Sequence, residues 1–213
     1  MTLTIRSSGD LASIVALGAA TFTDVRVREA DAELDGPLAA AEQAARLSPP
    51  SESQLVRRMY SRAGLDPTKT RPSSEALLRR VRRGGRLPRI NSLVDICNWC
   101  SLEFQLPYGL YDLDHVQGPI ELRLGKPGEE YAGIRKEMVH VAGRLVLTDG
   151  LGPFGNPSSD SARTMVTTAT VRALVVIFAP RQVDPARLSA ILGTTADRVT
   201  RFTGARELER VIV

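Results

Sequence analysis

Polar side chains on an otherwise apolar segment are the first candidates for chemistry in this sequence. The segment 87–102, LPRINSLVDICNWCSL, carries Asn91, Asp95 and Asn98 at spacings of four and three residues. On a helix, this spacing places all three side chains on one face. Polar groups among apolar ones must find partners within the protein or bind a ligand. The stripe therefore predicts either scaffolding within the protein or contact with a ligand, and we favour scaffolding for its three residues.

A second set of candidate residues is spread over the middle of the chain. It comprises Asp112, Asp114, Arg123, Glu129, Ser158, Ser159, Asp160, Ser161, Arg163 and Thr164. The hydroxyls of Ser161 and Thr164, together with the guanidinium of Arg163, are suited to hold a phosphate or a carboxylate. The same residues are also typical of a hydroxyl-rich turn that caps a strand. Glu129 and Arg123 lie six residues apart around a tight turn, so they can pair with each other.

The two cysteines, Cys97 and Cys100, form a C-x-x-C pair within the same helix-like segment. A redox pair of this spacing normally opens a helix, whereas this pair comes late in its segment and behind Asp95, which raises a thiol pKa. A zinc site needs four ligands, and the two histidines, His115 and His140, are far away in sequence. No glycine-rich phosphate loop or catalytic serine elbow occurs. We therefore expect packing cysteines, no metal and no cofactor.

The basic residues are nearly all arginine, which accounts for 25 of 28 and leaves a net charge of +4. Arginine binds phosphate and carboxylate groups through two parallel hydrogen bonds. Arg79, Arg80, Arg82 and Arg83 gather toward the end of a predicted helix, where the helix dipole also favours cations. The cluster therefore indicates either helix stabilisation or contact with RNA.

The bulk composition bounds the class of protein. A length of 213 residues suits one domain, and 43% hydrophobic with 24% charged residues is typical of a globular chain. No run approaches the roughly 18 apolar residues that a membrane span needs. The start of the chain carries Asp10 and lacks a clear cleavage site, which argues against a signal peptide. We expect a cytoplasmic protein that does not enter a membrane.

The elements that would position these side chains alternate without a regular pattern. Periodicity and turn residues predict helices at 38–48, 51–65, 71–85, 91–99 and 184–193, and strands at 21–30, 118–125, within 137–150 and at 170–180. Residues 1–20 suit a short strand and a helix, and the Gly/Pro/Ser-rich stretch 151–164 suggests a long loop. This mixture predicts an α+β fold, a single domain over 1–213 with a mixed, mainly antiparallel sheet flanked by helices. Residues 1–70 would form an N-terminal strand and helix layer, and 181–213 a C-terminal helical extension.

Four motifs between residues 91 and 129 carry a resemblance to a known family. They are N-x-x-V-D-x-x-N (91–98), P-x-x-x-Y-D (107–112), G-x-I-x-x-R (118–123) and G-E (128–129). With these motifs the region from about 71 to 180 resembles the editing (B3/B4) domain of the bacterial phenylalanyl-tRNA synthetase beta chain. The pattern S-D-S-x-R-T (159–164) is similar to free-standing proteins built from that domain. The resemblance implies a B3/B4-like fold and a cytoplasmic protein whose partner is tRNA or aminoacyl-tRNA.

The resemblance also implies roles for individual residues. In the family, the glutamate at the place of Glu129 recognises the hydroxyl of a misattached tyrosine, which is then hydrolysed from the tRNA. The substrate-binding set implied here is Glu129, Arg123, Asn91, Ser161, Arg163 and Thr164. Asp95, Asn98 and Asp112 would be structural polar residues near the pocket. Asn91 would lie nearest the helix start, while Asp95 and Asn98 would hold neighbouring backbone and the turn at 111–112.

Two departures from the family leave the function open. Gly109 stands where the synthetase has a histidine, and the stretch 150–170 replaces a glycine-rich strip. The chain is either an aminoacyl-tRNA deacylase acting in trans or a non-catalytic module that binds an amino acid or RNA. A third reading is an interaction domain with an empty pocket. The enzyme reading predicts one cavity lined by Glu129, Arg123 and the 159–170 loop.

Overall fold

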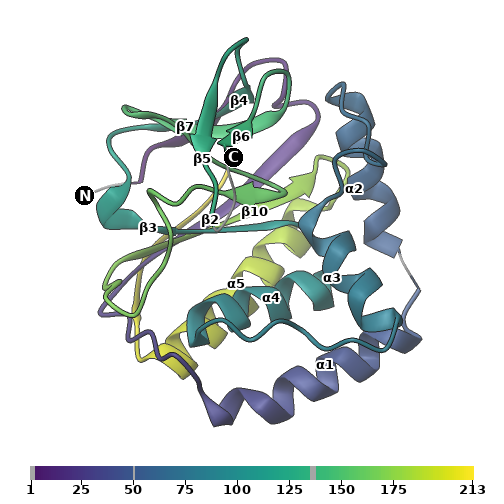
Figure 1. The fold of residues 1–213 in the computed structure, drawn as a ribbon, viewed down its shortest axis with the longest axis vertical. Coiled ribbons are helices and arrows are strands. Elements are labelled where there is room, and N and C mark those ends of the chain that lie inside the picture. The colour runs from purple at the N-terminus through teal and green to yellow at the C-terminus, as the bar shows by residue number, and fades with distance from the viewer. Residues whose placement is uncertain (1–2, 50, 135–137) are drawn as a thin grey trace.

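Two β-sheets and a group of helices make up the fold (Figure 1). The computed structural model describes residues 3–49, 51–134 and 138–213. The first sheet has the order β11-β2-β10-β3, formed by Arg206–Ile212, Val15–Thr23, Ala173–Pro180 and Tyr108–Asp112. The second has the order β1-β4-β7-β8-β9, formed by Ile5–Ser7, Ile120–Leu124, Leu145–Asp149, Gly152–Asn156 and Ser159–Asp160. A small ribbon pairs β5 (Glu130–Ala132) with β6 (Met138–His140). The β1–β4 pairing is parallel and the other pairings between these strands are antiparallel.

The helices gather on one side of the first sheet (Figure 1). They are α1 (Asp35–Leu47), α2 (Ser51–Arg62), α3 (Ser73–Arg82), α4 (Ser92–Phe104) and α5 (Pro185–Thr203), with 3₁₀ turns at Ala32–Leu34 and Leu113–His115. The predicted α+β class with a mixed, mainly antiparallel sheet is confirmed. In the described ranges, no helix combines the length and the apolar content that crossing a membrane requires.

The centre of the first sheet is built from two almost wholly buried strands, β2 and β10. Helix α5 packs directly on β2, since a Cβ at Gly18 would be in ordinary van der Waals contact, at 3.5 Å, with Leu188 and Leu192. The strand predicted at 21–30 is shifted: β2 ends at Thr23, and Asp24 turns the chain away with a φ of 60°. The helix expected within 1–20 is also wrong, because turns at 9–14 lead directly into β2.

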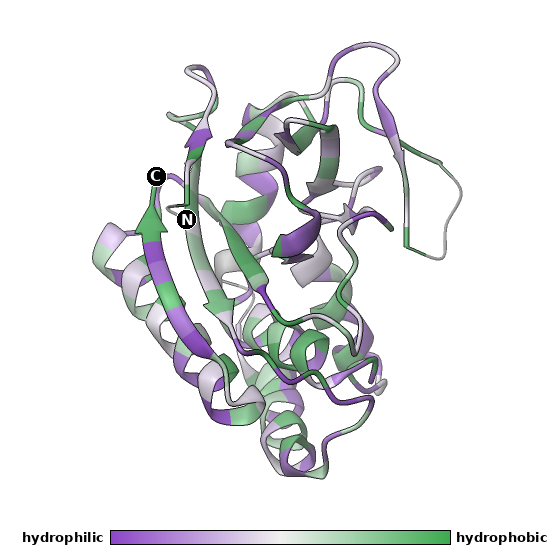
Figure 2. Cartoon of the chain, turned by 90° about the vertical axis from the view of Figure 1, so that its left-hand side faces the viewer, coloured by the Kyte–Doolittle hydropathy of each residue, from purple (hydrophilic) through white to green (hydrophobic). Residues whose placement is uncertain are grey.

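Three further expectations need correction. The predicted loop at 151–164 contains β8 and β9. Helix α3 spans Ser73–Arg82 and is shorter than the predicted 71–85. The Ser73 and Ser74 hydroxyls at its start make no hydrogen bond with a described residue. The C-terminal extension is not only helical, because α5 is followed by β11, which pairs with β2. Figure 2 shows β11 running to the C-terminus with hydrophilic and hydrophobic residues intermixed, as suits an edge strand.

Candidate functional site

A cavity of about 270 Å³ lies between α3, α4, β3 and the segment after β8. The described residues that line it are Ser73, Leu77, Ile90, Val94, Cys97, Asn98, Ser101, Tyr108, Leu110, Ile134, Asp160, Met165 and Val166. Its wall is mostly apolar, and Asp160 is the one acidic side chain among these residues. A cavity with apolar walls and a few convergent polar groups is the usual form of a small-molecule site.

Two elements supply six of the thirteen described lining residues through their periodicity. Helix α4 presents Val94, Cys97, Asn98 and Ser101 at helical spacing, and β3 presents Tyr108 and its second neighbour Leu110. Two of the hydroxyls are engaged: Ser101 donates to the Leu106 carbonyl at 2.7 Å, and Tyr108 lies 2.9 Å from the Thr195 hydroxyl. The Ser73 hydroxyl makes no hydrogen bond with a described residue. The Asn98 amide makes no hydrogen bond with a described residue. Asn98 and Ser73 are therefore the polar lining side chains without a described partner, and Asp160 adds the one acidic group among the described lining residues.

The backbone that carries Asp160 is fixed by a buried polar cluster. The Asn156 side-chain carbonyl accepts from the backbone N–H groups of Ser158 and Ser159 at 2.8 Å each. The Tyr131 hydroxyl donates to the Ser159 carbonyl at 2.5 Å and accepts from the Asn156 amide at 2.8 Å. The β8–β9 turn is thus held from two sides, so Asp160 has a defined place on the cavity wall.

Burial and the charge of Asp160 together raise the pKa of the neighbouring thiol and tyrosine hydroxyl groups. Burial, with a contribution from Asp160, raises the pKa of the Cys97 thiol and of the Tyr111 hydroxyl well above their ordinary values. The same two causes raise the pKa of Tyr131. At neutral pH these groups are protonated, so they can donate hydrogen bonds and are poor nucleophiles.

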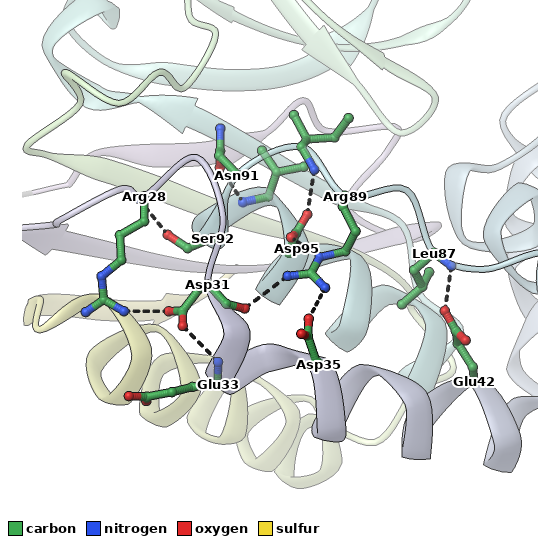
Figure 3. A network of polar contacts seen from close by, with 12 residues as sticks. Arg28, Asp31, Glu33, Asp35, Glu42, Leu87, Arg89, Asn91, Ser92 and Asp95 are labelled. Carbon is green, nitrogen blue, oxygen red and sulfur yellow. Dashed lines mark hydrogen bonds and ion pairs between the residues drawn. The ribbon is translucent and has the colours of Figure 1, made fainter.

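The predicted polar stripe of α4 divides into two kinds of residue, and Figure 3 shows the first kind, Asn91 and Asp95, at the start of the helix. Asn91 is the N-cap and its side-chain oxygen accepts from the Val94 N–H at 2.9 Å. Asp95 accepts from the Ile90 N–H at 2.9 Å and forms a 2.6 Å ion pair with Arg89. Asn98 lines the cavity instead. Asn91 and Asp95 are therefore engaged in holding the helix start, which is the predicted scaffolding role.

Asp95 was expected to hold neighbouring backbone and the turn at 111–112; it does hold neighbouring backbone, through the Ile90 N–H, but not the turn. Asp95 lies at the first turn of α4, where Arg89 and Ile90 reach it from the preceding segment. Asp112 is held separately, accepting from the Thr170 hydroxyl at 2.7 Å and from the Asp114 N–H at 3.0 Å.

Glu129 and Arg123 form a two-pronged ion pair with N–O distances of 2.6 and 2.7 Å. Glu129 also accepts from the Lys126 N–H at 2.7 Å, and the Arg123 guanidinium lowers its pKa to about 2. The turn through Gly128, with a φ of 79°, folds Glu129 back onto β4. The predicted pairing is confirmed, but neither residue lines the cavity. The expectation of one cavity shared with the 159–170 loop is therefore wrong, and only that loop reaches it, through Asp160, Met165 and Val166.

The polar groups of Ser161, Arg163 and Thr164, predicted to hold a ligand, are paired with other groups of the protein. The hydroxyls of Ser161 and Thr164 are buried and lie 3.1 Å apart. Arg163 pairs with both carboxylate oxygens of Asp149, at 2.9 and 3.0 Å, and donates to the His115 carbonyl at 2.7 Å. The geometry matches the alternative of a hydroxyl-rich turn, and a direct substrate contact by these residues stays a prediction.

Comparison with known proteins places this chain in a family. The family model described as "B3/4 domain" matches residues 55–211. The chain belongs to the B3/4 domain family. It is 31% identical over 143 residues to the phenylalanine–tRNA ligase beta subunit of Thiobacillus denitrificans, covering 65% of this chain and 18% of that protein. It is 27% identical over 169 residues to the same subunit of Latilactobacillus sakei, covering 76% and 20%.

The chain thus spans about a fifth of the length of these curated relatives. Among solved structures, an N-terminal fragment of the phenylalanyl-tRNA synthetase beta subunit from Pyrococcus horikoshii is similar, with a TM-score of 0.49 and 13% identity. That match covers 100% of this chain and 55% of the fragment.

The site of this B3/4 domain includes residues that the sequence reading did not single out as ligand contacts. Asp160 belongs to the candidate run 158–161, and it is the one acidic residue in that run, which is the sequence feature that could have indicated its place in the site. Cys97 and Cys100 are buried and unbridged, as expected of packing cysteines, and Cys97 also forms part of the cavity wall. Tyr108 gave no signal, because only the sheet pairing turns it toward α4.

Proposed function

We propose that this B3/4 domain binds the aminoacyl end of a tRNA and hydrolyses the ester of a misattached amino acid. The observation that carries the proposal is the apolar cavity with one carboxylate, Asp160, on its wall. The relatives are beta subunits of a tRNA ligase, which favours an aminoacyl group as the ligand. The amino-acid side chain would occupy the apolar part, and the ester would lie toward Asp160 and Asn98.

In this mechanism water attacks the ester carbonyl carbon, and the bond to the terminal ribose oxygen breaks. Asp160 is the candidate to orient the water and accept its proton, and the ribose oxygen leaves with a proton. Asn98 is the candidate hydrogen-bond donor to the substrate. Because aminoacyl esters are reactive, positioning of the water contributes much of the acceleration.

The exposed arginines of α3 support tRNA as the partner. Arg71, Arg79, Arg80 and Arg83 line a groove of about 520 Å³ on the helix whose Ser73 and Leu77 line the cavity. The side chains of Arg79 and Arg83 form no ion pair with a described residue. Unpaired guanidinium groups on a surface are suited to phosphodiester contacts. The groove would therefore hold the RNA backbone while the cavity holds the amino acid.

A non-catalytic binding module is the second candidate. One observation favours it: the described lining residues include no histidine, and the Ser101 hydroxyl already donates to the Leu106 carbonyl. No paired nucleophile and base therefore lies in the described part of the cavity. Such a module would hold an amino acid or the end of a tRNA without releasing a product.

The experiment is release of labelled amino acid from a panel of aminoacyl-tRNAs, including tyrosyl and other mischarged species. We expect Asp160→Asn to slow release at least tenfold, and Glu129→Gln to stay within about twofold of the unchanged chain. Release that needs Glu129 and not Asp160 would restore the sequence-based assignment of Glu129 as the substrate contact. Measurable tRNA binding with no release from any species would support the binding module.

A further inference from the structure

The hydroxyl of Tyr111 is a buried polar group that the proposed function leaves without a task. Tyr111 is 0% exposed, and its hydroxyl makes no hydrogen bond of ordinary geometry with a described residue. A buried hydroxyl without a hydrogen-bond partner destabilises the fold relative to one that has a partner. Phenylalanine would fill the same space without that cost, so the hydroxyl needs an explanation.

The ring of Tyr111 is locked between two glycines from different sheets. A Cβ at Gly109 on β3 would lie 2.1 Å from the Tyr111 hydroxyl, and one at Gly155 on β8 would lie 2.4 Å from it. Phe154 packs against the ring edge-to-face, with the centroids 4.9 Å apart. The hydroxyl therefore has one fixed position, in the space that a side chain at residue 109 or 155 would need.

This position is directly behind the cavity wall. Side chains alternate along a strand, so Tyr108 and Leu110 face the cavity while Tyr111 faces the opposite side, toward β8. Strand β9, which carries Asp160, packs against β3. Asp160 lines the cavity and is also the register partner of Gly155, whose Cβ position would lie 2.4 Å from the Tyr111 hydroxyl, so Asp160 lies beside that hydroxyl. The charge of Asp160 acts on the Tyr111 hydroxyl as well.

The other groups on described elements that face Asp160 are Tyr131 and Cys97. The Tyr131 hydroxyl already donates to the Ser159 carbonyl, and a thiol is a weak donor. Tyr111 is therefore the strong donor near Asp160 whose proton is not committed to a described residue.

We propose that Tyr111 is a positioning residue whose hydroxyl donates a hydrogen bond to Asp160 and thereby aims the carboxylate at the ligand in the cavity. The inference rests on the proposed function, because it assigns Asp160 its orientation in that site. A hydrogen bond to the charged form favours the charged form and fixes its direction. This hydrogen bond also requires glycine at positions 109 and 155, because a side chain at either position would displace the Tyr111 hydroxyl.

The test is Tyr111→Phe, which keeps the ring and removes only the hydroxyl. We expect the pKa of Asp160, followed by NMR of its carboxyl carbon, to rise, and kcat for amino-acid release to fall about tenfold with little change in KM. The matched control is Tyr60→Phe, a buried tyrosine whose hydroxyl contacts Ser158 at 3.1 Å instead. An Asp160 titration that is the same in Tyr111→Phe and the unchanged chain would overturn the proposal.

The titration separates this inference from the proposed function. A shifted pKa in a chain that releases no amino acid would sink the hydrolase proposal and support the positioning of Asp160. If Tyr111→Phe does not fold, the hydroxyl proton resonance of Tyr111 in the unchanged chain decides instead. A downfield resonance that moves in Asp160→Asn supports the hydrogen bond, and a resonance indifferent to that change overturns it.

Discussion

The Arg123–Glu129 ion pair makes stability depend on acidity at one residue. Arg123 lowers the pKa of Glu129 from 4.5 to about 2. The pair therefore stabilises the fold fully above about pH 4.5, and this contribution is lost as the pH falls through about 2. Both side chains are about a fifth exposed, so we expect Glu129→Gln to cost only about 1–2 kcal/mol at pH 7.

Urea unfolding of both chains between pH 2 and 7 measures this cost. The difference in unfolding free energy should shrink toward zero at the acid end of the series. A difference that stays constant over the whole range would show that the ion pair is not its source.

Position 109 has no room for a side chain, so even the methyl group of alanine should destabilise the fold. An alanine Cβ at this position would lie 2.1 Å from the Tyr111 hydroxyl and 2.6 Å from the ring carbon that bears it. We expect Gly109→Ala to lower the unfolding free energy by about 3 kcal/mol. Gly9→Ala is the control, because a Cβ there meets no atom within 4 Å. Denaturant unfolding measures the difference, and equal midpoint concentrations for the two variants would contradict this account.

At the scale of elements, different residues of α4 serve the stability of the fold and the binding of a ligand. Asn91 caps its start, so Asn91→Ala should cost about 1 kcal/mol of unfolding free energy. Asn98 faces the cavity without a described partner, so Asn98→Ala should change stability by less than about 0.5 kcal/mol. Calorimetry with phenylalanine as the probe should show weaker binding for Asn98→Ala and unchanged binding for Asn91→Ala. The reverse pattern would mean that the cap and not the cavity meets the ligand.

The arginine face of α3 should govern the affinity for RNA. Replacing Arg79 and Arg83 by alanine removes two exposed charges from the groove, and we expect tRNA binding to weaken about tenfold with a shallower salt dependence. The control replaces Arg181 and Arg201, two exposed arginines outside the groove, which gives the same net charge. Equal losses in the two double variants would indicate attraction by net charge alone.

Local sequence patterns predicted the elements that have strong periodicity or clear stops. Helices α1 and α4 and strands β4, β7 and β10 lie where apolar spacing placed them. Strand β2 was shifted because its residues are apolar on both faces, and such a run shows no alternation. The sequence of β8 resembles that of a loop because it contains Gly155. This glycine is needed to make room for the Tyr111 ring, which comes from a distant part of the chain.

The same contrast holds for the site. The stripe on α4 could be located from sequence, since its three residues share one helix. The convergence of Asp160 with Asn98 depends on how β9 packs beside β3, which no local pattern records. Glu129 shows the converse: its sequence context resembles a pocket residue, whereas a left-handed Gly128 returns it to Arg123.

At the scale of the whole molecule, Tyr111 joins the two sheets. Its ring projects from β3 of one sheet and inserts against Phe154 and Gly155 of β8 in the other. The cavity wall is therefore shared by both sheets, and any change in their relative placement moves Asp160 against Asn98.

Strand β2, near the start of the sequence, lies between β10 and β11. On the ribosome, the segment 15–23 therefore emerges long before either of its neighbours, and β11 follows after about 190 further residues. Strand β10 follows after about 150 residues, so at roughly 5–20 residues per second the apolar strand β2 has both edges open for about 8–30 s. We expect a translation product that stalls before β10 to aggregate more readily than one that contains both β10 and β11.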